Sequence, residues 1–137
     1  MKVYIITDLE GISGIGRADM VEKTSPDYPY ALERLMADTN AAVAGAFDGG
    51  ADEVLVEDGH GGGDNFLAGR LDPRAKENIG KTDYSTIDAI MHVGAHAMAG
   101  TLNAFLDHTQ SSVRWFDYRI NGRSMGEMGQ EAVLAGV

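Results

Sequence analysis

The chain has 137 residues, 44% hydrophobic and 23% charged, which predicts one soluble domain over residues 1–137. A formal net charge of −10, with scattered basic residues, argues against nucleic-acid binding, and the absence of cysteine excludes disulfides and thiolate ligands. An acid already stands at position 8 and no apolar run approaches membrane-spanning length, which predicts a cytoplasmic protein with no membrane partner.

The first half of the chain has a strand, helix, strand pattern. Residues Lys2–Thr7 form a β-branched and aromatic run that predicts a central strand buried on both faces. After Pro29, apolar residues recur at helical spacing up to Gly49–Gly50, which predicts a helix of about five turns. Residues Asp52–Asp58 predict a second strand, and this order favours two parallel strands joined by a right-handed crossover.

The second half has weaker signals. Residues 65–71 are at best a short helix, and Asp88–His96 predicts a third apolar strand. A hairpin is expected within residues 113–127, turning at Asn121–Gly122, a dipeptide suited to a type I′ turn. A helix begins near Gly126 and the sequence then stops in an apolar stretch, which predicts that the chain is the N-terminal part of a longer architecture.

These elements predict an α/β fold with a Rossmann-like, mostly parallel sheet flanked by helices in three layers. The three strands end in similar polar segments, "ITDLEG", "VEDGHGGG" and "VGAHAMAG". Because the carboxyl ends of parallel strands meet at one crevice, we expect Asp8, Glu10, His60 and His96 to lie close together.

The spacing of Asp8 and Glu10 indicates a cation. Residues i and i+2 of a strand point to the same side, about 6 to 7 Å apart, so both carboxylates can face one ion. Without that ion, two partly desolvated like charges repel each other. Carboxylate and imidazole ligands favour Zn²⁺, Mn²⁺, Co²⁺ or Fe²⁺, and zinc is the usual choice for hydrolysis.

The other two histidines have different expected roles. His92 lies inside the third strand, where alternation predicts a packed residue on one face of the sheet. His108 lies in a polar loop after His96 and could act as a proton donor or acceptor, since imidazole titrates near neutrality.

Four segments together resemble the D-aminopeptidase family of bacterial dipeptide-transport operons. They are "MKVYIITDLEGISGI", "EVLVEDGHG", "VGAHAMAGT" and "INGRSMGEMGQEAVLAG", and the similarity extends from the first residue to the last. Members of this family are zinc peptidases that assemble into ring-shaped, self-compartmentalising homo-oligomers.

The resemblance implies a site with two Zn²⁺ ions per active site. Matched by motif, its metal ligands are Asp8, Glu10, His60, His96 and Glu127, and His108 corresponds to the family's active-site histidine outside the metal shell. Five ligands for two ions imply a shared one, and Asp8 is the natural bridge. Only the resemblance points to Glu127.

The resemblance also implies the activity: release of N-terminal D-amino acids from short peptides. It implies that a second α+β portion of the family architecture is missing from this chain. Two alternatives stay open. One is a binuclear hydrolase of another amide or of a phosphoester, and the other is an inactive metal-binding fragment.

Overall fold

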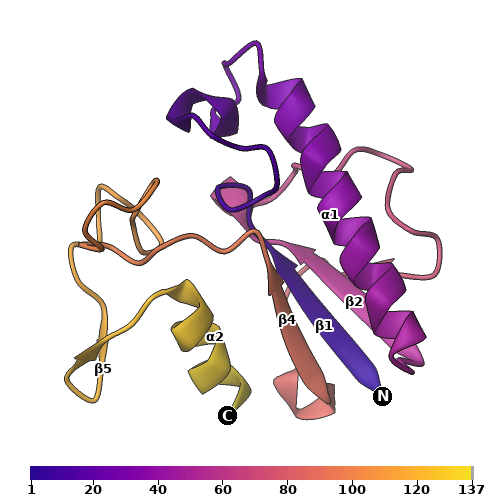
Figure 1. Cartoon of the computed structure of the whole chain (residues 1–137). Helices are drawn as coiled ribbons and strands as arrows, with labels where there is room; N and C mark the ends of the chain where they lie inside the picture. Colours follow the sequence, from indigo (N-terminus) through magenta and orange to yellow (C-terminus); the bar gives the residue numbers. More distant parts are fainter. Residues whose placement is uncertain (137) are drawn as a thin grey trace. The chain divides into compact units, whose positions relative to one another are not determined.

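The computed structural model describes residues 1–136. The chain divides into two units, Met1–Gly94 and Ala95–Val137. The first contains a parallel sheet and a long helix, and the second contains a small hairpin and a short helix (Figure 1). No helix within residues 1–136 is both long enough and apolar enough to cross a bilayer. The expectation of one domain over residues 1–137 stays a prediction.

The sheet has the strand order β3-β2-β1-β4, and every neighbouring pair is parallel. Its strands are β1 (Lys2–Thr7), β2 (Glu53–Asp58), β3 (Lys76–Glu77) and β4 (Ala89–Val93). Strand β1 lies between β2 and β4 and is buried over nearly its whole length, as its apolar sequence predicts. The predicted parallel α/β fold is therefore confirmed.

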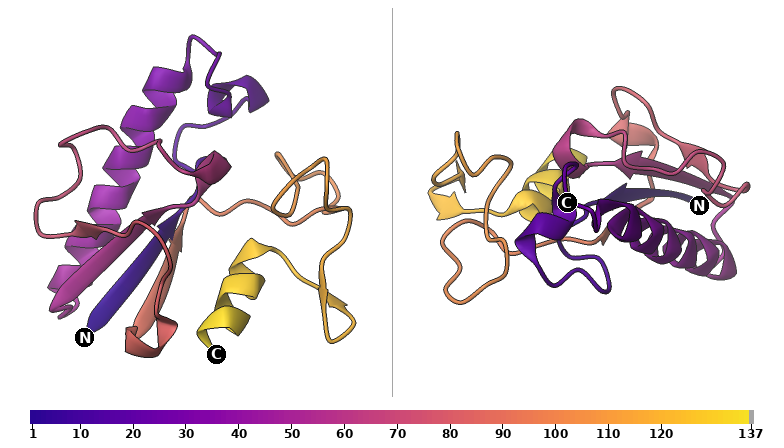
Figure 2. Two further views of the ribbon diagram at one scale, coloured as in Figure 1. Left: turned by 180° about the vertical axis from the view of Figure 1, so that it is seen from behind. Right: turned by 90° about the horizontal axis from the view of Figure 1, so that it is seen from above.

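Helix α1 (Tyr28–Asp48) covers one face of this sheet (Figures 1 and 2). The core between them consists of strand residues Val3, Ile5, Val54 and Val56 and helix residues Val43 and Ala46. The helix begins slightly before the predicted start, because Pro29 falls in its first turn, where the missing N–H costs no helical hydrogen bond. Its last residue is Asp48, and Gly49 caps its C-terminus, as predicted.

Loops between β2 and β4 run along the opposite face of the sheet (Figure 2). They include the short 3-10 helices η2 (His60–Gly62) and η3 (Tyr84–Thr86), and a third one, η1 (Ala18–Val21), precedes α1. The Tyr4 ring packs edge-on against Tyr84, and its hydroxyl donates to Glu57. Burial and this carboxylate raise the pKa of Tyr4.

Two elements of the first unit differ from the sequence prediction. Residues 65–71 form turns instead of a short helix, because the Asn40 side chain holds the Arg70 carbonyl and the Asp72 amide in a loop. Strand β4 ends at Val93, because Gly94 adopts a φ of +80°.

The second unit contains β5 (Arg119–Ile120), β6 (Arg123–Ser124) and α2 (Glu127–Ala135). The two strands pair antiparallel around Asn121 and Gly122, whose φ values of +52° and +79° fit a type I′ turn. The predicted hairpin is confirmed, with strands of only two residues each. Helix α2 follows Gly126 as expected.

Candidate metal centre

Backbone hydrogen bonds fix the segment after β1 between the ends of its two neighbours. The Asp8 amide donates to the Val93 carbonyl at 2.8 Å, and the Gly59 amide donates to the Thr7 carbonyl at 2.9 Å. The Gly11 amide donates to the Gly94 carbonyl at 2.8 Å. Asp8 and Glu10 are therefore placed by bonds to both neighbouring strand ends.

Asp8, Glu10 and His60 come together at this edge of the sheet. His60 Nδ1 lies 3.3 Å from Asp8 Oδ1 and 3.0 Å from Glu10 Oε2, and both carboxylates are buried. The ends of parallel strands β1 and β2 meet here as expected. The expected strand alternation between Asp8 and Glu10 was wrong, because β1 ends at Thr7. Residues 8–11 form a bend and a turn, and this turn brings both carboxylates to one imidazole.

The surroundings of Glu10 and His60 shift the pKa values of both groups. Burial alone would raise the pKa of Glu10, but hydrogen bonds with His60 and Asp8 and the charge of His60 lower it to about 2. Burial alone would lower the pKa of His60, but the two carboxylates raise it to about 10. At neutral pH, His60 therefore carries a proton that offsets carboxylate charge.

The contact made by Nε2 of His60 shows which of its two ring nitrogens can bind a metal. His60 Nε2 lies 3.3 Å from the Val21 carbonyl oxygen. A carbonyl only accepts hydrogen bonds, so Nε2 carries the hydrogen in the neutral imidazole and the lone pair is on Nδ1. An imidazole N–H held by a carbonyl is common in metal sites, because it fixes the ring and its tautomer.

The donor set of this cluster fits a divalent metal. One ligand atom from each of Asp8, Glu10 and His60 lies within 4.8 Å of the other two. Two carboxylates and one imidazole match the oxygen and nitrogen donors that Zn²⁺ accepts. The two buried carboxylates need a positive charge beside them, and a bound cation would supply it in place of the proton of His60.

Gly94 allows β4 to approach Asp8 closely. A Cβ atom at Gly94 would lie 2.0 Å from the Asp8 carbonyl oxygen, and its φ of +80° disfavours any other residue. We expect Gly94→Ala to lower the free energy of unfolding by about 2 to 5 kcal/mol, combining backbone strain and overpacking. Denaturant unfolding of the variant and the parent chain measures this loss.

Gly50→Ala is the matched control for Gly94→Ala. Gly50 has a similar φ of +94°, but no atom lies within 4 Å of a Cβ built there. This substitution should therefore cost only the backbone term, about 1 to 2 kcal/mol. Equal losses for the two variants would contradict a steric role for the approach to Asp8.

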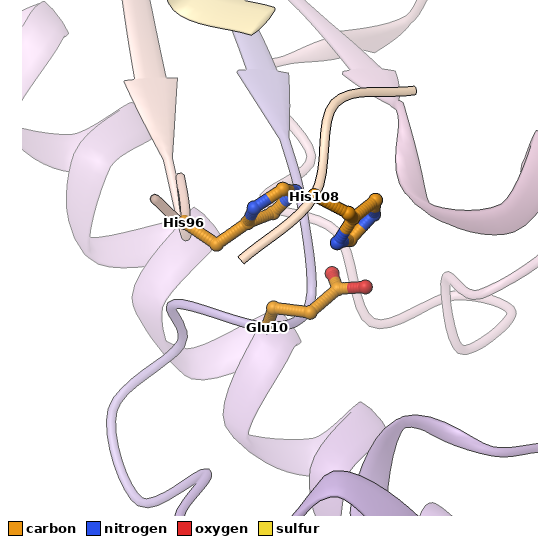
Figure 3. A group of neighbouring side chains, drawn as sticks. All are labelled: Glu10, His96 and His108. Atoms are coloured by element: carbon orange, nitrogen blue, oxygen red, sulfur yellow. The ribbon is translucent and has the colours of Figure 1, made fainter. Parts of the chain in front are cut away.

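A second cluster lies within the unit Ala95–Val137. The His96 and His108 rings stack with centroids 4.0 Å apart and planes 13° from parallel (Figure 3). His96 Nε2 lies 3.5 Å from Glu127 Oε1. That oxygen accepts a hydrogen bond from the backbone amide of Gln110 at 2.5 Å. Glu127 is the first residue of α2, where the helix dipole favours a carboxylate.

The tautomers of these two histidines follow from neighbouring carbonyls. His96 Nδ1 lies 2.9 Å from the Ala97 oxygen, and His108 Nδ1 lies 2.8 Å from the Leu106 oxygen. In the neutral rings, Nδ1 therefore carries the hydrogen and the lone pair is on Nε2. His96 can bind a metal through Nε2, and His108 can take up a proton at Nε2.

His108 also lines a cavity of about 590 Å³ formed by residues of the same unit. Its walls include the apolar side chains of Met98, Val113, Trp115 and Phe116. A cavity beside a side chain that can transfer protons has the composition of a small-molecule site.

The structure thus places the six predicted site residues in two groups. Asp8, Glu10 and His60 lie together in the first unit, and His96, His108 and Glu127 lie together in the second. The residue pattern alone did not indicate Glu127, although a glutamate directly after a glycine at a helix start is a usable signal. His92 lies on β4 as predicted, and its Nδ1 is buried without a hydrogen-bond partner among residues 1–136.

Comparisons with known proteins find similar chains among the D-aminopeptidases. A D-aminopeptidase from Bacillus subtilis (strain 168) is 31% identical over 144 residues, covering 99% of this chain and 52% of the relative. A solved structure described as the Zn-dependent D-aminopeptidase DppA from Bacillus subtilis, a self-compartmentalizing protease, matches with a TM-score of 0.86 and 30% identity. That match covers 99% of this chain and 52% of the solved chain, so this chain spans about half the length of these relatives.

The family model Peptidase M55, described as D-aminopeptidase, matches residues 1–137. Because this match extends over the whole sequence, the chain belongs to the D-aminopeptidase family Peptidase M55.

Proposed function

We propose that this chain provides the metal-binding part of a zinc-dependent aminopeptidase that releases N-terminal D-amino acids from short peptides. The observation that carries the proposal is the buried cluster of Asp8, Glu10 and His60 at the carboxyl ends of parallel strands. Family membership supports the peptidase class, and the description of the solved relative as Zn-dependent supports the metal.

In this proposal the ligands come from both clusters. Asp8, Glu10, His60, His96 and Glu127 would hold two zinc ions, and Asp8 would be the ligand that the ions share, because a carboxylate has two oxygens. The donor atoms described above support this assignment, because in the neutral rings Nδ1 of His60 and Nε2 of His96 carry the lone pairs.

The chemistry divides between metal and protein. When bound, zinc would supply Lewis-acid chemistry, which polarises a carbonyl and lowers the pKa of water. The chain itself contributes His108, whose Nε2 accepts a proton from the attacking water or donates one to the leaving amine. Its Leu106 partner and the stacked ring of His96 keep Nε2 in one orientation.

The substrate enters this proposal as a short peptide with a free amine. The cavity beside His108 offers space for it, and its apolar walls suit amino-acid side chains. With a net charge of −10, the protein attracts an ammonium group more readily than an anion. The D-stereochemistry rests on the family alone.

We also propose that the chain associates with copies of itself into a ring. The support is the description of the solved relative as self-compartmentalizing. Size-exclusion chromatography with light scattering, run with and without zinc, gives the mass of the assembly. A monomer under both conditions would contradict the proposal for this chain.

A substrate panel tests the activity. Zinc-loaded protein is incubated with matched D- and L-aminoacyl peptides and with a phosphoester, and product formation is followed. We expect hydrolysis of the D-aminoacyl peptides only, with a rate that disappears when a chelator removes the metal. Cleavage of the phosphoester alone would replace this proposal with that of another binuclear hydrolase.

Metal analysis of the same samples separates the remaining alternative. Bound zinc without hydrolysis of any substrate would identify the chain as an inactive metal-binding fragment. If the protein contains no zinc and hydrolyses no substrate, the proposed metal centre itself is overturned.

A further inference from the structure

Asn65 is a fully buried polar residue in the loop that carries His60. Its side-chain amide donates to the His60 carbonyl at 2.7 Å and to Asp58 Oδ1 at 2.9 Å. Its backbone amide donates to Asp58 Oδ2 at 2.5 Å, and its side-chain oxygen accepts from the Tyr28 hydroxyl. Both amide hydrogens and the amide oxygen therefore have partners.

These bonds close the loop at both ends. Asp58 is the last residue of β2, His60 begins η2, and Tyr28 begins α1. Asn65 thus joins the end of a central strand, the loop that presents His60 and the start of the long helix.

We propose that Asn65 is a positioning residue that holds His60 in its metal-binding orientation, an inference that rests on the zinc function proposed above. The His60 carbonyl accepts hydrogen bonds from the Asn65 side chain and from the Gly63 amide. With the backbone held there, the imidazole lies with Nδ1 toward Asp8 and Glu10 and Nε2 toward the Val21 carbonyl.

The chemistry of the position requires an amide. An aspartate has the same shape, but it cannot donate to the His60 carbonyl or to Asp58 when ionised. It would also place a second carboxylate against Asp58. An alanine would leave the His60 and Asp58 oxygens without this donor, and burial makes such a loss costly.

The test measures zinc affinity of the full chain by competition with a chromophoric chelator, at a temperature where every variant is folded. We expect Asn65→Ala and Asn65→Asp each to weaken zinc binding about 10- to 100-fold, the range for residues that orient a metal ligand. Asn65→Asp is the sharper variant, because its added negative charge alone would favour a cation. Tyr28→Phe keeps both Asn65 donors and should have a smaller effect.

Asn40→Ala is the matched control. Asn40 also bridges α1 to a loop through two hydrogen bonds, to the Arg70 carbonyl and from the Asp72 amide, but that loop carries no proposed ligand. Its substitution should lower the free energy of unfolding and leave the zinc affinity of the folded protein unchanged.

The outcomes distinguish this inference from the function on which it rests. If the parent chain binds no zinc, the proposed function fails. If the parent binds zinc and Asn65→Asp binds it equally well or more tightly, the positioning role is overturned. Equal losses of affinity for Asn65→Ala and Asn40→Ala would also overturn it, because they would reflect general destabilisation.

Discussion

Replacing Asp8 with asparagine should remove both zinc binding and hydrolysis, whereas replacing His108 with phenylalanine should remove only hydrolysis. Asp8 is a buried carboxylate beside Glu10 and His60 and the proposed bridge between two ions. Its loss should weaken zinc binding more than about 100-fold, since even substitution of a residue that only orients a ligand lowers metal affinity about 10- to 100-fold.

His108→Phe is designed to keep the packing of the second cluster. The ring of His108 stacks on His96, and a phenyl ring preserves that contact while removing Nε2 and its proton. We expect kcat to fall about 10²- to 10⁴-fold, the usual contribution of a general acid or base. Zinc content, measured by metal analysis after dialysis, should match that of the parent.

The two variants together discriminate among roles. Loss of zinc in His108→Phe would make His108 a ligand instead of a proton-transfer residue. Full activity in Asp8→Asn would contradict the proposed centre.

Zinc binding should release a proton from His60, and this makes zinc affinity strongly dependent on pH. The pKa of His60 is raised to about 10 in the metal-free protein, so its imidazole is protonated at pH 7. A metal requires the neutral ring, so ligation must displace that proton. Glu10, with its pKa lowered to about 2, is already ionised and releases none.

Zinc affinity should rise with pH. Below the pKa of His60, each unit of rising pH lowers the cost of removing its proton, so affinity should increase about tenfold per unit and about 100-fold from pH 6 to pH 8. Calorimetry at pH 7 in buffers with different ionisation enthalpies counts the released protons.

A matched pair of histidine variants assigns the proton. His60→Ala should bind zinc weakly and release about one proton fewer than the parent chain. His92→Gln changes a histidine of the same unit outside the cluster and should retain the release. Zinc binding to the parent without any proton release would contradict ligation by His60.

The apolar patterns of the sequence were sufficient to predict the central sheet. The β-branched run of Lys2–Thr7 and the helix ending at Gly49 both appear as expected, because burial in parallel α/β folds leaves a local periodic signal. Strand β3 was not predicted, because its two residues are both exposed and carry no such pattern.

Residue chemistry also identified most of the candidate site. Acids and histidines that follow apolar strands indicated Asp8, Glu10, His60 and His96, while Glu127 came only from the family resemblance. The sequence could not indicate which nitrogen of each imidazole carries a hydrogen. That depends on carbonyl groups of Val21, Ala97 and Leu106, whose positions are set by the folded backbone.

By itself, the sequence determined the residue types of the candidate site, the parallel direction of the strands and the resemblance to the family. Only the tertiary structure decided how Asp8 and Glu10 reach one imidazole, because a turn after Thr7 replaces the expected strand alternation. It also decided the roles of Gly94 and Asn65. Their partners are fixed by backbone approaches and side-chain hydrogen bonds made in the folded chain, and a local sequence pattern contains no record of such contacts.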